Sequence, residues 1–222
     1  MVTREFDLAE TDRLLTTTRA VRKRLDLQRP VDPATIIDCL RIACQAPSGA
    51  NSQRWRWVIV RDPEKKRVIA DAYRAAYEAY SAPRRQLVPA QDRSAVRVLE
   101  SSDYLAEHLA DVPLLVIPCT LDQLLPESTS QERASLYGGI LPAVWGFQLA
   151  LRSRGLGSAF TTLHLVHERA VGEVLGIPET VMQVALLPVA YYLGDDFQPA
   201  PRRPVDEITY WDTWKNTAVD TA

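Results

Sequence analysis

Residues 45–57, QAPSGANSQRWRW, mark the point where a helical pattern gives way to a strand. Pro47 and Gly49 are typical of a helix stop, because proline lacks the backbone N–H of a helix interior and glycine tolerates the backbone that ends one. The next stretch, RWRWVIVRD, is rich in aromatic and β-branched residues and closes at Asp62-Pro63, which predicts a strand. The connection carries more polar side chains than a turn requires.

The segment that leads into this turn, VDPATIIDCLRIACQAPSG, predicts a helix. Asp32 stands where an N-cap belongs, and Pro33 fits the first turn. The spacing of apolar residues predicts a buried face made of Ile36, Ile37, Leu40, Ala43 and Cys44. The turn therefore lies between a capped helix and a strand.

The rest of the chain mixes helices with short apolar strands. Helices are expected over residues 8–20, 63–80, about 90–110, 134–154 and 167–179. Strands are expected over residues 113–119, 157–163 and 181–194, and a mobile polar loop over 120–133. Prolines at 199, 201 and 204 predict an extended arm, about 195–222. The order fits one layered α+β domain over residues 1–222.

The composition narrows the function classes. The chain has 222 residues, 46 % of them apolar, and this length and apolar share are enough for a buried core. The net charge of −2 argues against nucleic acid as a partner. We expect no membrane-spanning segment, because no apolar run approaches ~20 residues, and no export signal, because the N-terminus is charged. The scattered cysteines Cys39, Cys44 and Cys119 indicate reduced core residues of a cytoplasmic protein.

Two basic stretches are candidate anion sites. The first holds Arg19, Arg22, Lys23, Arg24 and Arg29, and the second presents Arg202 and Arg203 among prolines. Each is either a solvated surface or a place where guanidinium groups bind a phosphate. Spacing alone does not show whether the two stretches converge.

Other motifs favour packing roles over chemistry. His164 and His167 form an H-x-x-H pair, but only Glu168 lies nearby as a further ligand, so packing or surface histidines are favoured over a metal site. Gly138-Gly139 lacks the lysine and the spacing of a phosphate loop and is interpreted as helix-packing glycine. No serine or cysteine lies in a motif typical of a nucleophile, so the pattern does not favour a hydrolase.

The polar turn has the composition of a wall for a planar ligand. Ser48, Asn51 and Gln53 supply hydrogen-bond donors and acceptors. Trp55 and Trp57 lie two apart on a strand, so they share one face and are expected to pack the core or an interface. From these residues alone, a ligand role and a structural role are equally favoured.

Four stretches, taken in order, resemble the FMN-dependent nitroreductase family. They are TTTRAVRKRLD (16–26), APSGANSQRWRWVIV (46–60), LALRSRGLGSAFTTL (149–163) and LPVAYYLGDDFQPAPRRPVDEI (187–208). The first is similar to the family's basic opening, the second to its polar loop and strand, and the last to its C-terminal tail. The resemblance covers most of residues 12–212.

The resemblance implies a nitroreductase-like α+β fold with a central, mostly antiparallel sheet flanked by helices. It also implies a homodimer in which the C-terminal arm is exchanged between subunits and one FMN lies in each of two sites between them. FMN would take a hydride from NADH or NADPH and pass electrons to a nitroaromatic, a quinone or a similar small-molecule acceptor in a ping-pong reaction. No metal and no catalytic side chain is implied, because the flavin carries the hydride.

The family pattern assigns three groups of residues to FMN. The phosphate and ribityl end would be held by Arg19, Ala20 and Arg22, with Arg202 and, less strictly, Arg203 from the tail. The turn of the other subunit would contribute Pro47, Ser48, Gly49 and Asn51. The ring would pass Phe160, Thr161, Thr162 and Leu163, with a backbone N–H of Thr161 or Thr162 near the flavin N5.

Departures from the pattern leave some of these assignments open. Ala20 and Gly49 replace serines of the family, and Arg54 replaces a proline, which adds a cation near the mouth of the cleft. Lys23 is an alternative to Arg22, because this stretch is one residue longer than usual. Relatives that act as dehydrogenases or dehalogenases, or that modify the flavin, and a non-catalytic flavin-binding protein, remain alternatives. The segments 81–93 and 120–133 are expected to form the lid that decides among them.

Overall fold

The computed structural model describes residues 6–217. The described chain forms two compact units, one over residues 18–195 and one that combines residues 6–17 with residues 196–217. The larger unit contains the sheet and all but one of the described α-helices. The single domain over residues 1–222 stays a prediction.

A five-stranded sheet forms the centre of the larger unit. Its strands are β1 (Trp55–Val60), β2 (Leu114–Thr120), β3 (Leu156–Ser158), β4 (Met182–Gln183) and β5 (Leu187–Tyr191). Their order is β1-β2-β5-β3, with β4 also paired to β2, and all four strand pairings are antiparallel. Every residue of β2 is buried, as its uninterrupted apolar sequence predicts. The predicted antiparallel α+β fold is confirmed.

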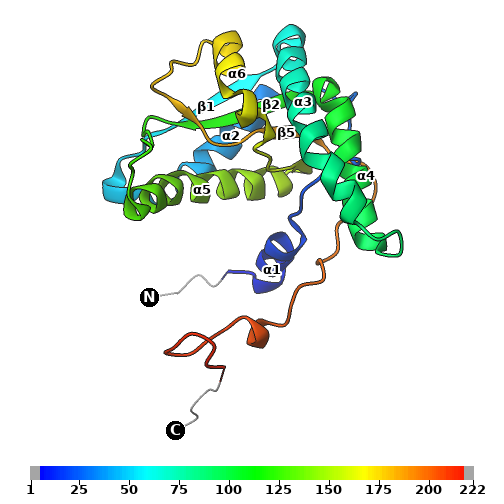
Figure 1. The fold of residues 1–222 in the computed structure, drawn as a ribbon, viewed down its shortest axis with the longest axis vertical. Helices are drawn as coiled ribbons and strands as arrows, with labels where there is room; N and C mark the ends of the chain where they lie inside the picture. The colour runs from blue at the N-terminus through cyan, green and yellow to red at the C-terminus, as the bar shows by residue number, and fades with distance from the viewer. Residues whose placement is uncertain (1–5, 218–222) are drawn as a thin grey trace. The chain divides into compact units, whose positions relative to one another are not determined.

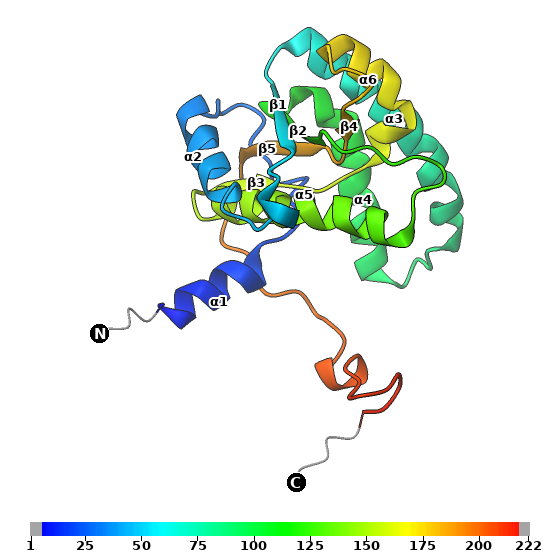
Figure 2. The same ribbon diagram turned by 90° about the vertical axis from the view of Figure 1, so that its left-hand side faces the viewer.

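Helices cover the sheet from two sides. They are α2 (Pro33–Ala43), α3 (Pro63–Leu87), α4 (Arg93–His108), α5 (Ser130–Arg152) and α6 (Glu168–Leu175). Helices α2 and α5 pack against each other on one side, and α3 and α6 lie on the other (Figures 1 and 2). The helical layers bury the apolar residues of β2 and β5 between them.

Helix α2 begins as predicted and faces the core differently. The Asp32 carboxylate accepts a hydrogen bond from the Ala34 N–H at 3.0 Å, which confirms the N-cap. Ile36 and Ala43 are buried, but Ile37 is 47 % exposed and Cys39 is fully buried in its place. Leu40 and Cys44 are partly buried against the core, so the buried stripe differs from the predicted one only in that Cys39 takes the place of Ile37, on the face that meets α5.

Helix α3 is longer than predicted. The expected end near residue 80 is wrong, since the helix continues through Pro83 to Leu87. A proline removes one N–H from the helical hydrogen-bond ladder. Packing outweighs this loss, because buried side chains continue along the helix to Tyr77 and Ser81. The 81–93 segment is therefore mostly helix.

Helix α5 starts before its predicted first residue, 134. Thr129 accepts a hydrogen bond from the Glu132 N–H at 3.2 Å, and Glu132 accepts one from the Thr129 N–H at 2.7 Å. This reciprocal capping box has a sequence signature, T-x-x-E, that lies upstream of the apolar pattern used to place the helix. It shortens the predicted 120–133 loop at its C-terminal end.

By length and composition α5 could cross a membrane, contrary to the expectation that no segment could. A core helix meets the same criterion, and α5 packs against α2 and β3.

Two predicted strands are also shorter than expected. The 157–163 strand ends at Ser158, and the 181–194 strand is divided into β4 and β5.

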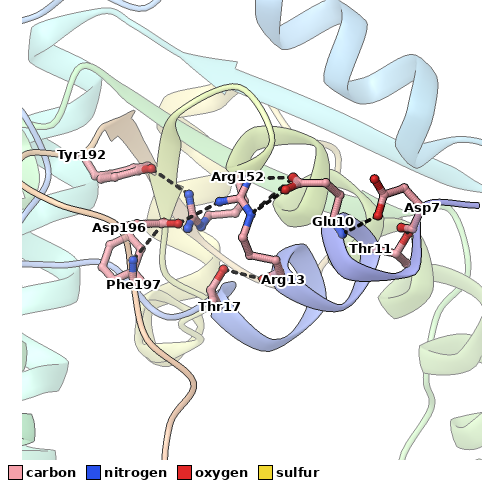
Figure 3. Close-up of polar contacts among 9 residues, drawn as sticks. All are labelled: Asp7, Glu10, Thr11, Arg13, Thr17, Arg152, Tyr192, Asp196 and Phe197. Carbon is pink, nitrogen blue, oxygen red and sulfur yellow. Dashed lines mark hydrogen bonds and ion pairs between the residues drawn. The ribbon is translucent and has the colours of Figure 1, made fainter.

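The terminal unit contains one α-helix, α1 (Leu8–Thr17), which ends three residues before the predicted boundary. Arg13 forms an ion pair with Glu10 at 2.8 Å and a second with Asp196 at 2.8 Å (Figure 3). Between residues 196 and 217 the chain has one 3-10 turn, Val205–Glu207, and no other described helix or strand. The arm is therefore irregular, as its prolines predict.

Candidate functional site

Residues from two of the three predicted groups meet around a cavity of about 240 Å³ in the larger unit. We call it the Arg22 pocket. Its lining consists of Arg22, Tyr73, Tyr77, Tyr80, Ser102, Phe160, Thr161, Thr162 and Leu163. The structure thus brings Arg22 together with the whole 160–163 segment, as expected for two parts of one site. Lys23, its predicted alternative, forms an exposed ion pair with Glu100 at 3.2 Å instead.

The position of Arg22 follows from the way its segment runs beside β3. Ala20 pairs with Ser158 in a parallel bridge, and the Val21 N–H donates to the Ser158 carbonyl at 2.9 Å. A side chain at Gly157 would collide with Val21, because its Cβ would lie 2.9 Å from the Val21 Cβ. Glycine at 157 therefore permits the close approach that carries Arg22 to the pocket.

One of the two backbone N–H groups predicted to lie near the flavin is already hydrogen-bonded within the chain. The Thr161 N–H donates to the Leu186 carbonyl at 3.1 Å, and the Leu186 N–H donates back to Thr161 at 2.8 Å. Within residues 6–217 no backbone hydrogen bond uses the N–H of Thr162. Of the two backbone donors predicted to serve a ligand, Thr162 is the one that remains available.

The opposite wall of the pocket comes from α3 and α4. The Tyr77 hydroxyl donates to the Asp103 carboxylate at 2.6 Å, and Arg85 bonds both oxygens of the same carboxylate. Burial raises the pKa of Asp103, but the hydrogen bonds from Arg85 and Tyr77 outweigh it and leave the pKa below its usual value. Burial, aided by Asp103, raises the pKa of Tyr77. These bonds join the two helices into one wall.

Sequence reasoning missed this tyrosine wall. Tyr73, Tyr77 and Tyr80 follow one another at helical spacing in AYRAAYEAY, which was a usable signal. Tyr73 and Tyr77 stack with ring centroids 6.3 Å apart, and both are buried. Burial also raises the pKa of Tyr73, so both phenols stay protonated at neutral pH.

The polar turn lines a different cavity, of about 600 Å³, which we call the turn cavity. It lies between the turn, the segment after β2 and the first turns of α5. Its lining consists of Gly49, Ala50, Ser52, Arg54, Asp122, Gln123, Leu125, Ser128, Gln131, Glu132, Ser135, Leu136 and Gly139. Gly49 therefore lines a different cavity from Arg22 within one chain. This separation fits a site in which the turn serves the other subunit.

The turn itself is held in an unusual backbone conformation. Ala50, Asn51 and Gln53 have φ values of 51°, 52° and 48°, in the left-handed region that asparagine tolerates but alanine and glutamine rarely adopt. The Gln53 N–H donates to the Ser48 hydroxyl at 3.2 Å, and the Gln53 side chain donates to the Asn51 side chain at 3.0 Å. Gln53 therefore supports the turn through its backbone and its side chain. Pro47 precedes these residues at the end of the α2 connection.

The two tryptophans have structural roles. Trp55 is buried in the core, and Trp57 packs beside it with its ring centroid 5.3 Å from that of Phe147. The predicted packing role of both residues is confirmed. Arg54 forms an ion pair with Asp122 and donates to the Leu121 carbonyl at 2.9 Å. The predicted cation is thus present, and it is paired.

Two members of the basic cluster tie down the chain after β5. The Arg24 side chain donates to the Leu193 carbonyl at 2.6 Å and to the Asp195 carbonyl, while Arg29 lies over the Tyr191 ring at 3.5 Å. Gly194, with φ of 79°, turns beside the Arg24 guanidinium. Arg24 and Arg29 therefore hold backbone and aromatic groups of this chain, so these two members of the basic stretch have a structural role.

The remaining predicted cofactor residues are Arg19, which precedes the Ala20 bridge, and Arg202 with Arg203 in the terminal unit. The Arg202 guanidinium donates to the Pro201 carbonyl at 3.0 Å. Convergence of these arginines with Arg22 stays a prediction.

The histidine and cysteine interpretations fit the structure. His164 is fully buried, and burial lowers its pKa to about 4, whereas His167 is exposed. Within residues 6–217 no group of three or more His, Cys, Asp or Glu side chains is arranged to hold a metal ion. Cys39 and Cys119 are buried, Cys44 is half-buried, and all three are free thiols.

Helix α5 leaves an apolar stripe uncovered. Tyr137, Leu141 and Trp145 are 40 %, 37 % and 44 % exposed and recur every fourth residue. A Cβ added at Gly138 or Gly139 would meet nothing within 4 Å, so the predicted helix packing at these glycines is wrong within one chain. The stripe is available to a second molecule.

Comparisons with known proteins agree with this fold. The family model described as "Nitroreductase family" matches residues 15–191. The chain is 31 % identical to an iodotyrosine deiodinase of Drosophila melanogaster over 78 % of its own length and 59 % of that protein, so it spans less than two thirds of this relative. It is 29 % identical to a 5,6-dimethylbenzimidazole synthase of Rhodospirillum rubrum over 81 % of this chain and 78 % of that one.

Solved structures show the same architecture. An iodotyrosine deiodinase bound to FMN and 3-iodo-L-tyrosine has a TM-score of 0.67 at 26 % identity, over 90 % of this chain and 98 % of that one. An FMN and NADPH-dependent nitroreductase from sphigopyxis sp. strain HMH has a TM-score of 0.66 at 18 % identity, over 94 % and 100 %. The chain belongs to the nitroreductase family of flavin-dependent oxidoreductases.

Proposed function

We propose that this protein is an FMN-dependent oxidoreductase that uses NADH or NADPH to reduce nitroaromatic, quinone or similar acceptors in alternation. The observation that carries the proposal is the Arg22 pocket. It places a permanent cation and the available N–H of Thr162 on one side of a cavity with aromatic walls. These groups suit a flavin ring, because a cation and an N–H donor can stabilise the negative charge of its reduced form.

The chemistry of the pocket fits part of FMN and leaves the rest to other segments. Its volume of about 240 Å³ is below the ~300 Å³ at which small-molecule sites begin, so it encloses only part of such a cofactor. Arg22 and Arg19 would hold the phosphate and ribityl end, with Ala20 contributing backbone. Phe160, Thr161 and Leu163 would flank the ring, and Thr162 would donate its N–H to the ring nitrogen N5.

A second subunit would complete the site. Members of this family are typically dimers, and the exposed Tyr137, Leu141 and Trp145 stripe offers an apolar surface for the partner. The partner's turn, with Ser48 and Asn51 flanked by Pro47 and Gly49, would form the second wall. Arg202 and Arg203 would reach the phosphate from an arm exchanged between subunits.

FMN, when bound, would supply the redox chemistry by accepting a hydride from NAD(P)H and returning two electrons to the acceptor. A quinone would gain these two electrons and two protons to become a hydroquinone. The protein's own part is to bind and orient. Arg22 would stabilise negative charge, and the tyrosine wall would keep water from the ring.

Reductive dehalogenation is a second candidate, and one observation favours it. The Drosophila melanogaster relative at 31 % identity is an iodotyrosine deiodinase, as is the FMN-bound structural neighbour. A third candidate is a flavin-binding protein without catalysis.

The free thiols suit the reducing cytoplasm, where we place the protein.

Spectroscopy of the purified protein tests the proposal. We expect a flavin absorption spectrum, or its appearance when FMN is supplied, and bleaching by NADH or NADPH without oxygen. Protein that neither carries nor binds FMN would refute the proposal, and bound flavin that neither donor bleaches would leave a passive binder. Turnover of a nitroaromatic and a quinone against an iodophenol then separates the first two candidates.

A further inference from the structure

The turn cavity contains a basic side chain whose charge is balanced within the cavity wall. Arg54 forms an ion pair with Asp122, and its Nη2 donates to the Leu121 carbonyl at 2.9 Å. The backbones are joined as well, because the Leu121 N–H donates to the Arg54 carbonyl at 3.0 Å. The two charged side chains are 45 % and 42 % exposed, so both remain within reach of a molecule in the cavity.

The rest of the lining is mostly uncharged, and about half of it is polar. Five side chains, Ser52, Gln123, Ser128, Gln131 and Ser135, carry hydroxyl or amide groups. The Glu132 carboxylate is engaged by the N–H and the hydroxyl of Thr129, at 2.7 and 2.9 Å. A volume of about 600 Å³ lies within the range of small-molecule sites.

The segment after β2 forms a wall of this cavity and is held by hydrogen bonds, while the mobility that the sequence predicts for it stays a prediction. The Asp122 N–H donates to the Thr120 hydroxyl at 3.2 Å, and the Leu125 N–H donates to the Ser128 hydroxyl at 2.9 Å. Arg133 donates to the Pro126 carbonyl at 3.0 Å. These bonds set the cavity's shape before a ligand arrives.

We propose that the turn cavity is the acceptor subsite and that it selects uncharged, planar acceptors with hydrogen-bonding oxygens because Asp122 neutralises Arg54. The proposal rests on the function proposed above, in which the turn lies beside the flavin bound by the other subunit. An anionic acceptor has to compete with Asp122 for Arg54 and lies close to the Asp122 carboxylate. A neutral acceptor meets neither cost and finds hydroxyl and amide partners.

Equilibrium binding to the oxidised, FMN-loaded protein tests this preference without turnover. The probes are 4-nitrobenzamide and 4-nitrobenzoate, which have similar shapes and differ in charge, and calorimetry gives their dissociation constants. We expect the wild-type protein to bind the amide more tightly. Asp122→Asn should tighten 4-nitrobenzoate binding by about threefold to fivefold, the upper part of the range for an exposed ion pair, and change the amide by less than about twofold.

A double variant separates charge neutralisation from an anion grip. Arg54→Gln with Asp122→Asn removes both charges and should restore the wild-type ratio of the two dissociation constants. If the double variant binds 4-nitrobenzoate more weakly than the wild type does, with the amide unchanged, Arg54 already binds anions in the wild type, which would overturn the proposal. A wild-type preference for 4-nitrobenzoate, or an unchanged ratio in Asp122→Asn, would overturn it too.

A steric pair of variants locates the ligand. Ser135→Leu fills the turn cavity and should weaken both probes, whereas Ser153→Leu, at the opposite end of α5, should change neither. Binding that Ser135→Leu leaves unchanged would place the acceptor elsewhere. FMN content and bleaching by NADH are measured on the same samples. Absent FMN would refute the proposed function, while retained, reducible FMN with unmoved binding ratios would refute only this inference.

Discussion

The Arg22 pocket and the turn cavity belong to one chain and differ in their chemistry. The first is narrow, about 240 Å³, and combines Arg22 with three tyrosines; the second is about 600 Å³, and its arginine is paired with an aspartate. A small aromatic pocket with a cation suits a resident anionic cofactor, whereas a wider, partly polar cavity whose arginine is already paired suits molecules that exchange. The comparison indicates that the Arg22 pocket serves to retain the cofactor and the turn cavity to select the acceptor.

Acidic pH should lower the free energy of unfolding through His164, which lies beside the Arg22 pocket in the sequence. His164 follows Leu163, and its pKa of about 4 in the folded protein lies below the usual 6.5. Below pH 6.5 the unfolded chain takes up a proton that the folded chain does not, so stability falls until the pH reaches about 4. The loss approaches ~3 kcal/mol. Urea unfolding at several pH values should show this dependence in the wild type and lose it in His164→Leu, while His167→Leu, at an exposed site, keeps it.

Removal of the pocket cation should release the cofactor. Arg22→Ala is expected to weaken FMN binding by about 1.5–3 kcal/mol, the worth of a charge-assisted contact, or roughly 10-fold to 150-fold. Flavin fluorescence measures the dissociation constant. Lys23→Ala is the matched control, because Lys23 pairs with the exposed Glu100 and should leave the constant unchanged. Equal FMN affinity in Arg22→Ala and wild type would remove Arg22 from the site.

The two surfaces should join only in a dimer. Trp145→Ala shortens the exposed α5 stripe and should weaken dimerisation by ~2 kcal/mol, or about thirtyfold, if this tryptophan is a central contact. Sedimentation velocity at several concentrations gives the dissociation constant. Val166→Ala truncates an exposed residue away from the stripe and should have no effect. A wild-type monomer at micromolar concentration would contradict the two-subunit site.

The smallest effect is expected from the tyrosine wall. Asp103→Ala removes the acceptor shared by Tyr77 and Arg85 and should lower the free energy of unfolding by about 1 kcal/mol. Asp71→Ala breaks an exposed pair with Arg74 on the same helix and should cost less than ~0.5 kcal/mol. Equal losses in the two variants would mean that the wall adds nothing beyond surface pairing.

Local signals predicted much of the fold. Asp32 and Pro33 start α2, and the apolar run of β2 is buried throughout. The capping box at Thr129 was also readable from T-x-x-E. Each signal acts between residues only a few positions apart, so both partners can be recognised in one short stretch of sequence.

Longer-range features escaped prediction. The end of α3 depended on packing that carries the helix through Pro83, and the exposure of Ile37 depended on which face of α2 meets α5. For the site, the motifs predicted that Arg22 and the 160–163 segment lie together. They did not predict the tyrosine wall, because Asp103 and Tyr77 meet only when α3 and α4 pack.

The polar turn shows what the sequence by itself determined and what only the tertiary structure decided. The sequence determined the turn, because Pro47, Gly49 and the strand at Trp55 are local signals, and its motifs determined the family. The tertiary structure decided that Arg54 is neutralised and that the turn lines its own cavity. Asp122 is far from Arg54 in sequence and reaches it because β1 and β2 pair antiparallel, which brings the start of one strand beside the end of the other.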